Sequence, residues 1–334
     1  MRRQNNRVNQ LLEVKGLYIG YKTYIGKLKV LNGVDFMVHK GEKVGVIGES
    51  GCGKTTTMRA ILRILSTNAV IDGGEIHFRG NDVLEMGKKQ LNEMRRNNVT
   101  MIFQDPTAAL NPVFKVGELL ADVIKYSGKY GSKQASKKEI HGKSIDILKE
   151  VALPDPERVL DSYPFQLSGG MRQRICIAMS LATAKDLLIA DEPTTNLDVT
   201  IQDQVLRLMK NLVEKRNLSV ILISHALGTV RGTVDTVYVM YAGNMIEAAR
   251  TEELFSNPLH PYTQGLLKSV PKLTGAGFSE GIKGRVPDYI NPPSGCRFHP
   301  RCDRALDICR KEKPRFLNID GNNHKVACWL YGKK

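Results

Sequence analysis

The chain has no run of about 18 apolar residues, so the sequence predicts no membrane-spanning helix. The first residues, Met1–Arg7, are basic but lack the apolar core of a signal peptide, and we therefore expect a cytoplasmic protein. A strong compositional bias is also missing. Of the 334 residues, 42% are hydrophobic and 25% are charged, which excludes a disordered chain, a collagen-like chain and a disulfide-stapled mini-domain.

Acidic residues are scarce relative to basic ones. The chain has 34 Asp and Glu against 49 Lys and Arg, a formal net charge of +15. Such an excess is compatible with nucleic acid, anionic lipid headgroups or nucleotide phosphates, and it does not choose among them. Most of these charges are expected to be solvated surface, so the motifs must decide the function.

Six cysteines are present, and tight C-x2-C pairs, which zinc ribbons usually have, are absent. Cys52 and Cys176 are scattered. The other four form a C-x5-C-x6-C-x18-C group near the C-terminal end, which in a reducing compartment suggests a metal or cluster site before disulfides. This spacing suits a [4Fe–4S] cluster at least as well as zinc, and free or buried thiols stay open. His299 and His324 are alternative ligands. The four cysteines are Cys296, Cys302, Cys309 and Cys328.

Apolar runs predict an α/β protein. Short strands are expected between residues 11 and 40, and a compact apolar strand at Lys43–Gly48. The runs Val99–Phe103, Leu187–Ala190 and Ser219–Ile223 are almost continuously apolar, as in a parallel sheet buried on both faces. Helical patterns alternate with these strands, which favours a parallel α/β sheet.

Changes in composition predict the organisation of the chain. We expect a main domain over residues 1–270, with a Lys-rich helical subdomain over about residues 105–180. Gly, Pro and Ser dominate residues 271–295, which indicates a linker. The cysteine-rich segment 296–334 follows. No internal repeat is present in the sequence.

Residues 48–55 read G-E-S-G-C-G-K-T and fit the pattern G-x-x-x-x-G-K-[ST], between the strand at 43–48 and a helix predicted from Thr55 to about Leu65. In such a loop the backbone N–H groups surround phosphate oxygens, and the helix N-terminus adds a positive dipole end. Lys54 would reach the β and γ phosphates, and the Thr55 hydroxyl would bind Mg²⁺. The predicted nucleotide contacts of this loop are Gly48, Glu49, Ser50, Gly51, Cys52, Gly53, Lys54, Thr55 and Thr56.

Two acidic residues end the buried strand at 187–190. An acid at this position can meet the metal that a glycine-rich loop holds. We expect Asp191 to hold Mg²⁺ through water and Glu192 to polarise the attacking water.

A second glycine-rich segment, Leu167–Arg174, opens an apolar helix at Ile175–Ala182. Ser168, Gly169 and Gly170 at a helix start offer unpaired N–H groups and a hydroxyl, which makes a second anion site. One triphosphate needs one such anion-binding loop. Two of them in a chain therefore suggest a sandwich dimer, in which each subunit completes the nucleotide site of the other.

Taken together, these residues resemble the ATP-binding subunit of an ABC transporter, over about residues 11–270. Residues 167–170 match the signature, residues 195–198 the D-loop, and Ser224-His225 the switch histidine. The resemblance implies a P-loop NTPase ABC ATPase fold: a RecA-like mixed sheet core, an antiparallel β subdomain and a helical subdomain, followed here by a C-terminal cysteine-rich extension.

The resemblance also implies roles for single residues. Gln104 matches the Q-loop and would sense Mg²⁺ and the water, while His225 would contact the γ-phosphate. Ser168 would close on ATP bound in the opposite subunit. Adenine usually stacks on an aromatic side chain before the P-loop, for which Tyr21 is the choice and Tyr24 the alternative.

Finer features are similar to the oligopeptide/dipeptide/nickel (Opp/Dpp) importer ATPases: the segments Phe103–Pro106 with Ala109–Pro112, Asn257–Thr263 and Asn291–Cys296. This resemblance implies two ATPases, one a homologue of the other, that drive two permease subunits fed by an external peptide-binding protein. The chain would sit at the cytoplasmic side of the cell membrane, with a [4Fe–4S] cluster on its four C-terminal cysteines. Dipeptide, oligopeptide and nickel all stay open as cargo.

Three positions depart from the family pattern. Ala226 follows the switch histidine where the family usually has Asp, which affects the hydrogen bonding expected around His225. Asn196 replaces a small residue of the D-loop, and the sequence indicates no role for this change. Cys52 replaces a small residue in the P-loop and is interpreted as a filler.

Two other functions compete. A cytosolic ABC ATPase acting on nucleic acid or ribosomes would suit the positive charge. The ribosome-recycling type, however, has two ABC modules and N-terminal clusters, and the DNA-repair type has a long coiled coil between P-loop and signature. A nucleotide-binding regulatory subunit without turnover is disfavoured by the intact set Lys54, Glu192 and His225. We therefore expect an ATPase with no nucleic acid partner.

Overall fold

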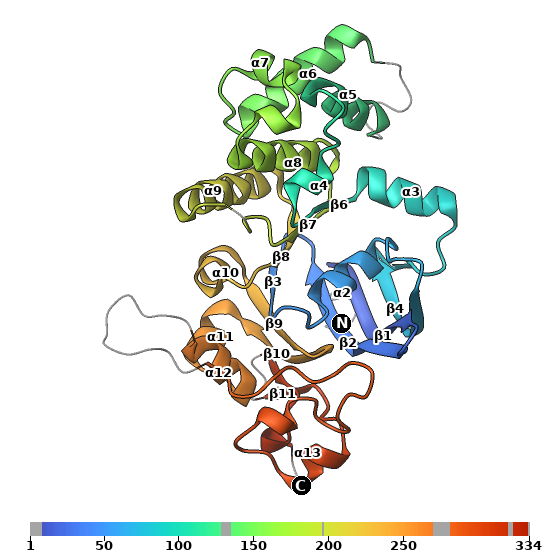
Figure 1. Cartoon of the computed structure of the whole chain (residues 1–334), viewed down its shortest axis with the longest axis vertical. Helices are drawn as coiled ribbons and strands as arrows, with labels where there is room; N and C mark the ends of the chain where they lie inside the picture. Colours follow the sequence, from blue (N-terminus) through green and yellow to red (C-terminus); the bar gives the residue numbers. More distant parts are fainter. Residues whose placement is uncertain (1–8, 128–134, 196, 270–280, 320–322, 333–334) are drawn as a thin grey trace. The chain divides into compact units, whose positions relative to one another are not determined.

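The structure, a computed structural model, describes residues 9–127, 135–195, 197–269, 281–319 and 323–332. The chain forms two compact units, which are described separately. Unit 1 comprises Met1–Glu85 and Ser224–Lys334, and unit 2 comprises Met86–Ile223 (Figure 1). The predicted linker lies partly outside the described residues, because only its residues 281–295 are among them.

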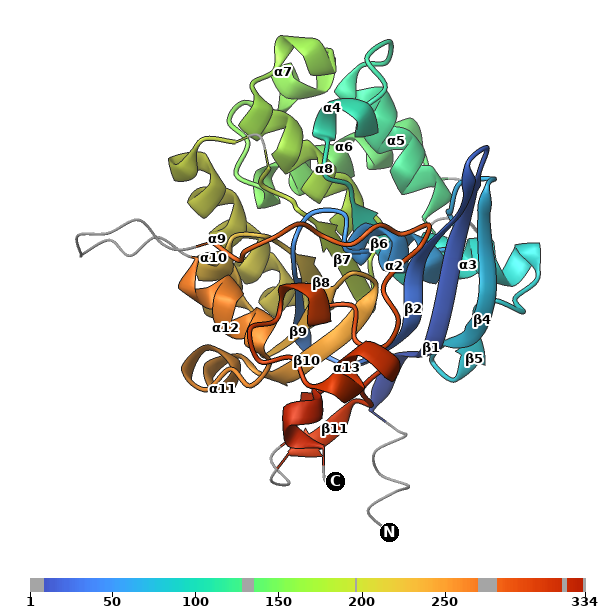
Figure 2. The ribbon, with the colours of Figure 1, turned by 60° about the horizontal axis from the view of Figure 1, so that its bottom comes forward.

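The first sheet of unit 1 is antiparallel, with the order β2-β1-β4-β5, and Figure 2 shows its long strands side by side. The prediction of short strands here was wrong, because β1 and β2 have 14 residues each. Bulges interrupt the apolar alternation without ending the strands: the register shifts between Val14 and Leu17, around Gly16 with φ 52°. The strands are β1 (Gln10–Thr23), β2 (Gly26–His39), β4 (Ala69–Phe78) and β5 (Asn81–Asp82).

The second group of strands in unit 1 is mixed, with the order β3-β9-β10-β12-β11. Strands β3 and β9 pair in parallel, and Val44, Val46, Val237 and Val239 on them are fully buried, which explains the compact apolar run at this place in the sequence. The other neighbours pair antiparallel. The strands are β3 (Lys43–Ile47), β9 (Thr236–Tyr241), β10 (Asn244–Arg250), β12 (His324–Val326) and β11 (Leu317–Ile319).

The C-terminal segment is built into unit 1. Strand β12 pairs with β10, and Glu247 lies opposite Val326. Lys29 donates its backbone N–H to the Tyr289 carbonyl at 2.7 Å, so residues of the expected linker also pack on the first sheet. The segment that we expected to extend beyond the nucleotide-binding domain therefore shares the strands of that domain.

One helix of unit 1, α2, follows the glycine-rich loop, and the others lie in the later part of the sequence. Helix α2 ends earlier than predicted, because Arg63 adopts φ 49° and Ile64 donates its N–H back to the Arg59 carbonyl at 2.9 Å, a common way for a helix to end. The helices are α2 (Lys54–Ile61), α10 (Leu227–Thr233), α11 (Thr251–Ser256), α12 (Pro261–Lys268) and α13 (Asp307–Lys311), with the 3-10 turns η2 (His299–Arg301) and η3 (Trp329–Tyr331).

Unit 2 contains three parallel strands in the order β6-β7-β8, and the prediction of buried parallel strands is confirmed. The Lys-rich part of the chain contains α5, α6 and α7, and α5 packs with both of the others and with α8. The strands are β6 (Val99–Ile102), β7 (Leu187–Asp191) and β8 (Ser219–Ile223). The helices are α3 (Lys88–Asn97), α4 (Pro106–Ala109), α5 (Val116–Tyr126), α6 (Lys137–Glu150), α7 (Pro156–Asp161), η1 (Pro164–Gln166), α8 (Gly169–Thr183) and α9 (Val199–Arg216). Within the described ranges of both units, no helix is long and apolar enough to cross a membrane.

A buried polar cluster in unit 1 joins β10 to the start of α12. The carboxylate of Glu247 is fully buried and accepts the N–H groups of Leu259 at 2.6 Å and His260 at 2.9 Å. His324 is hydrogen-bonded to the same carboxylate at 2.8 Å. Nδ1 of His260 accepts the Tyr262 N–H at 3.0 Å and thereby caps α12. Burial lowers the pKa of His260 to about 4, so this ring is neutral at physiological pH.

We predict that His260→Asn reduces the loss of stability at acidic pH. The folded pKa of His260, about 4, lies below its ordinary value of 6.5, so its contribution is fully present above pH 6.5 and is lost as the pH falls toward 4. Between these limits the free energy of unfolding should fall by up to about 3 kcal/mol more in the wild type than in the variant. Denaturant unfolding at a series of pH values measures this, with the more exposed His141→Asn as control. Equal pH dependence of wild type and His260→Asn would contradict the prediction.

Candidate nucleotide-binding site

The loop after β3 has a backbone that only glycine adopts readily. Gly48, Gly51 and Gly53 have φ of 152°, 76° and 109°. A Cβ atom on Gly48 would lie 2.1 Å from the Met240 carbonyl oxygen on β9, so the loop is also packed too closely there for a side chain. A loop with these φ values can turn its backbone N–H groups toward a bound phosphate, as the sequence pattern predicts.

Lys54 lies at the centre of this loop. Its side chain is buried, and Nζ donates to the carbonyl oxygens of Gly48 at 2.7 Å and Glu49 at 3.0 Å. The ammonium group is therefore held inside the ring of backbone atoms that would surround a phosphate. Burial raises the pKa of the neighbouring Cys52 thiol more than Lys54 lowers it, so this thiol stays neutral, as a filler would.

Tyr21 lies near the helix that follows the loop. Its hydroxyl donates to Oγ1 of Thr56 at 3.4 Å, and the side chain is half-buried. Tyr24, in contrast, is 99% exposed. Of the two aromatic residues considered for adenine, the structure brings Tyr21 to the loop and helix that contain Lys54 and Thr55.

In unit 2, the two acids at the end of β7 have different surroundings. Asp191 is the last residue of the strand and is buried. Glu192 has φ 47°, a strained value for a residue other than glycine, and its N–H donates to the Ile223 carbonyl at 3.0 Å.

The carboxylate of Glu192 is held by two neutral donors. Nε2 of Gln104 donates to Oε2 at 2.8 Å, and the Thr195 hydroxyl donates to the same oxygen at 3.1 Å. Gln104 and Glu192 were each predicted from their own motif, and the structure links them directly. Thr195 was recognised only as part of the D-loop, and its hydrogen bond to Glu192 could not be read from the sequence.

The second glycine-rich segment starts α8 as predicted. Ser168 is exposed and caps the helix, since its hydroxyl accepts the Met171 N–H at 3.3 Å. Gly169 and Gly170 form the first turn. A Cβ atom on Gly170 would lie 2.9 Å from the Ile201 side chain of α9, so this glycine also permits close helix packing. Asn196, the position that departs from the D-loop pattern, lies outside the described residues.

The switch histidine region belongs to unit 1. His225 is exposed and Ser224 is buried. The backbone N–H of Ala226 donates to the Ser224 hydroxyl at 3.0 Å. At the position where the family usually has Asp, the local hydrogen bond is therefore made by the backbone and the preceding serine.

The four C-terminal cysteines lie within electrostatic range of one another. Burial raises the pKa of Cys296 to about 11, and the other three thiols add to the rise. Burial likewise raises the pKa of Cys328 to about 11, with contributions from Cys302 and Cys309. Among the residues that the structure describes, however, no three or more His, Cys, Asp or Glu side chains are arranged to hold a metal ion.

The two histidines considered as alternative ligands have other partners. Nδ1 of His299 is hydrogen-bonded to the Cys296 carbonyl at 2.9 Å, and Nε2 of His324 to Glu247 at 2.8 Å. The indole N–H of Trp329 donates to the Glu312 carbonyl at 2.9 Å. These contacts hold the C-terminal segment together.

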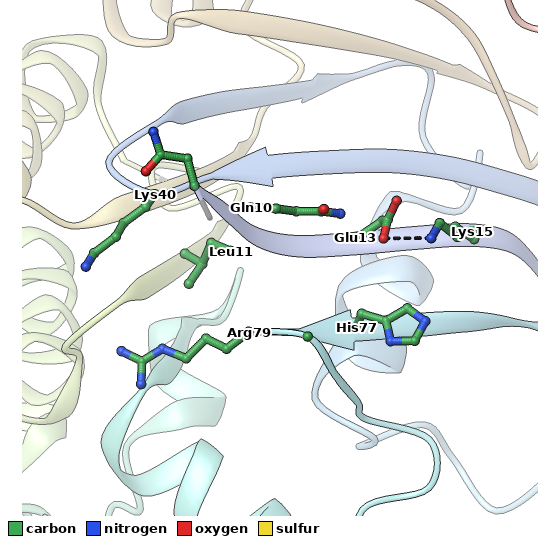
Figure 3. Close-up of a pocket in the computed structure, with 9 residues that line it drawn as sticks. Gln10, Leu11, Glu13, Lys15, Lys40, His77 and Arg79 are labelled. Atoms are coloured by element: carbon green, nitrogen blue, oxygen red, sulfur yellow. Dashed lines mark ion pairs between the residues drawn. The ribbon is translucent and has the colours of Figure 1, made fainter. Parts of the chain in front are cut away.

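A pocket of about 550 Å³ lies on the first sheet of unit 1 and contains none of the predicted nucleotide contacts (Figure 3). Lys15, Lys40, Arg79 and His77 make its lining basic, and Lys15 pairs with Glu13 at 2.8 Å. The loop geometry, and not this pocket, therefore indicates the nucleotide site.

Comparisons with known proteins agree with this geometry. The chain matches the family described as "ABC transporter" over residues 31–195 and that described as "Oligopeptide/dipeptide transporter, C-terminal region" over residues 246–309. It is 43% identical to the oligopeptide transport ATP-binding protein OppD of Bacillus subtilis (strain 168), over 97% of this chain and 90% of that protein. The dipeptide transport ATP-binding protein DppD of the same organism is also 43% identical, over 98% of this chain and 96% of that protein.

Solved structures share the fold. A dimeric post-hydrolysis structure of the ATP-binding cassette MJ0796 with ADP and phosphate has a TM-score of 0.63 at 23% identity, covering 72% of this chain and 98% of that one. The chain is therefore an ABC transporter ATPase subunit, with the mixed α/β sheets of that fold. Within this class, it belongs to the ATP-binding proteins of oligopeptide and dipeptide transport, as the sequence motifs predicted.

We predict that Gly48→Ala abolishes high-affinity ATP binding. A Cβ atom 2.1 Å from the Met240 carbonyl must displace either the loop or β9, and the backbone N–H groups then lose their arrangement. The dissociation constant of a fluorescent ATP analogue should rise at least about tenfold, equal to about 1.4 kcal/mol. Gly73→Ala is the control, since nothing lies within 4 Å of its added Cβ. Unchanged ATP binding by Gly48→Ala would refute the role of this close approach.

Proposed function

We propose that this chain binds and hydrolyses ATP to drive peptide import through a membrane transporter, as a peripheral subunit at the cytoplasmic side of the membrane. The observation that carries the proposal is the extent of the similarity, which covers the nucleotide motifs and continues through the C-terminal region characteristic of oligopeptide and dipeptide transporters. Relatives over nearly the full length are named as peptide transport proteins, which favours peptides over nickel as cargo.

Catalysis in this proposal depends on positioning. Lys54 and the backbone of residues 48–53 would bind the phosphates. The Thr55 hydroxyl would be an oxygen ligand of Mg²⁺, and Asp191 would hold the ion through water. When bound, Mg²⁺ neutralises charge on the β and γ phosphates. Glu192 orients and polarises the attacking water, while Gln104 and Thr195 fix the direction of its carboxylate. His225 would contact the γ-phosphate.

Two copies of the domain would complete two sites. Ser168 is exposed at the start of α8, a helix of 15 residues, and its first turn offers N–H groups to an anion. We propose that this segment closes on ATP bound in a second ABC ATPase. The second ATPase is a homologue of this chain, with an identical copy as the alternative. The solved structure of MJ0796, a bacterial ABC transporter cassette with the same fold, is dimeric.

A groove of about 320 Å³ in unit 2 is suited to a permease segment. It is mainly apolar, and its lining includes Phe103 and Tyr126, which are 40% and 62% exposed. Phe103 immediately precedes Gln104, the residue that holds Glu192. A helix of the permease inserted here would therefore press on the segment that positions the catalytic carboxylate.

The four cysteines fit a [4Fe–4S] cluster by their chemistry. Four thiols gather in one segment. Burial raises the pKa of Cys296, Cys302 and Cys328, so these three stay protonated at neutral pH unless a metal displaces the protons. Their described arrangement does not hold a metal, so binding requires the sulfur atoms to converge. We propose a structural [4Fe–4S] cluster, with zinc as the alternative, since ATP hydrolysis needs no electron transfer.

We predict that the anaerobically purified chain is brown and contains iron and acid-labile sulfide, because thiolate-bound clusters absorb visible light. Cys309→Ser should remove the colour and the iron, while Cys176→Ser, at a buried cysteine outside the group, should keep both. Bound zinc without iron would select the alternative. Absence of both metals from the wild type would refute the proposal.

We predict that Glu192→Gln binds ATP with unchanged affinity but hydrolyses it at least about 100-fold more slowly, because the water loses its polarising group. In the assembled transporter the same change should stop peptide uptake. With ATP, the Glu192→Gln variant should also stay dimeric, because hydrolysis does not separate the subunits. Size-exclusion chromatography of the variant, alone and mixed with a homologous ATPase, shows whether it pairs with itself or with the homologue. Glu85→Gln, at an exposed side chain, is the control. Wild-type turnover by Glu192→Gln would refute the assignment of the base.

A further inference from the structure

The phosphate-binding loop contains an acidic side chain that the motif does not require. Glu49 lies directly after Gly48, and its carbonyl oxygen accepts the Nζ of Lys54 at 3.0 Å. A carboxylate at this position adds a negative charge to a loop that must attract a triphosphate. Unless it is neutralised, this charge opposes ATP binding.

Arg301 supplies the opposite charge. Its Nη1 donates to Oε2 of Glu49 at 2.8 Å and its Nη2 to Oε1 at 3.1 Å, so the pair is bidentate. The side chains of Arg301 and Glu49 are 5% and 25% exposed. A bidentate pair so largely shielded from water is held more firmly than an exposed ion pair.

The position of Arg301 does not depend on Glu49 alone. Its Nε donates to the Lys283 carbonyl at 2.8 Å and its Nη2 to the Ile282 carbonyl at 3.2 Å. Its Nη1 also donates to the Tyr241 hydroxyl at 3.4 Å, and the guanidinium lies 5.7 Å from the centre of the Tyr241 ring. The guanidinium is thus placed in advance, and Glu49 is the group that it orients.

Two tyrosines hold the backbone of the same loop. The Glu49 N–H donates to the Tyr262 hydroxyl at 2.9 Å, and the Tyr289 hydroxyl donates to the Gly51 carbonyl at 2.9 Å. Burial raises the pKa of both tyrosines well above the ordinary value, so neither adds a negative charge beside the loop. Glu49 is therefore the acidic group that Arg301 must compensate among these contacts.

We propose that Arg301 is a positioning residue of the ATP site: it turns the Glu49 carboxylate away from the phosphates and neutralises its charge. This inference rests on the proposed nucleotide site at Lys54. It assigns to a residue of the C-terminal segment an effect on ATP affinity that acts through charge.

Four proteins test it: the wild-type chain, Arg301→Met, Glu49→Gln and the double variant, each as the full chain. A fluorescent ATP analogue and its ADP counterpart are titrated at low and high ionic strength. Arg301→Met should weaken ATP binding about tenfold and ADP binding less, and the loss should shrink as salt screens the charge. The double variant should bind within about threefold of the wild type, because the uncompensated carboxylate is gone.

Arg304→Met is the matched control, since Arg304 donates to Gln264 at 2.9 Å and has no described contact with the loop. If Arg301→Met does not fold, Arg301→Lys decides: it keeps the charge but not the bidentate geometry, and it should bind ATP more weakly than the wild type and regain affinity with Glu49→Gln. Unchanged ATP affinity overturns the proposal, and so does an equal loss for ATP and ADP that Glu49→Gln does not reverse. Wild-type ATP binding by Lys54→Ala would instead refute the nucleotide site itself.

Discussion

A ring of backbone N–H groups can bind an anion only if the chain folds back on itself within a few residues, and this constraint governs the structure around Lys54. The positive φ values of Gly48, Gly51 and Gly53 make such a turn possible. The approach of the Met240 carbonyl leaves no room for a side chain at Gly48. Fully buried parallel strands fix the start of the loop, because β3 cannot shift without disturbing β9. The packing of unit 1 thus holds the loop in a conformation that it would not keep in isolation.

Unit 2 uses a different device to orient a reactive group. The strained backbone at Glu192 directs the carboxylate, and two neutral donors hold one of its oxygens. Neutral donors stabilise the direction of a carboxylate without cancelling its charge, which the proposed role of Glu192 in polarising water requires. At Glu49 the opposite is required, because a charge there serves no step of the reaction, and a cation is its partner. Two glutamates of one ATPase therefore have contrasting surroundings for contrasting reasons.

Much of the site could be predicted because its motifs are local. The loop at residues 48–55, the acids after β7 and the start of α8 each need only a few adjacent residues, and the structure has them in the expected elements. The lengths of β1 and β2 were missed, since a bulge breaks the apolar alternation while the strand pairing continues. The early end of α2 depends on Arg63 adopting a left-handed backbone conformation, which an arginine in the sequence does not predict.

Contacts between residues that are far apart in the sequence could not be predicted, for another reason. Arg301 and Glu49 are 252 positions apart, and neither one's neighbours indicate the other. The same holds for Tyr289 and Gly51, which are 238 positions apart. The arrangement of the four thiols also depends on how the whole C-terminal segment packs, which the spacing of the cysteines does not determine.

The attachment of the C-terminal segment to the phosphate-binding loop limits how far this ATPase can be treated as an interchangeable module. Arg301 stands directly before Cys302, and the turn that contains it is bounded by Cys296 and Cys302. A chimera that joins residues 1–270 to a foreign C-terminus would leave Glu49 without its arginine and Gly51 without its tyrosine. Such grafts should therefore transfer residues 281–332 together with the cassette, even when only the cassette's turnover is wanted.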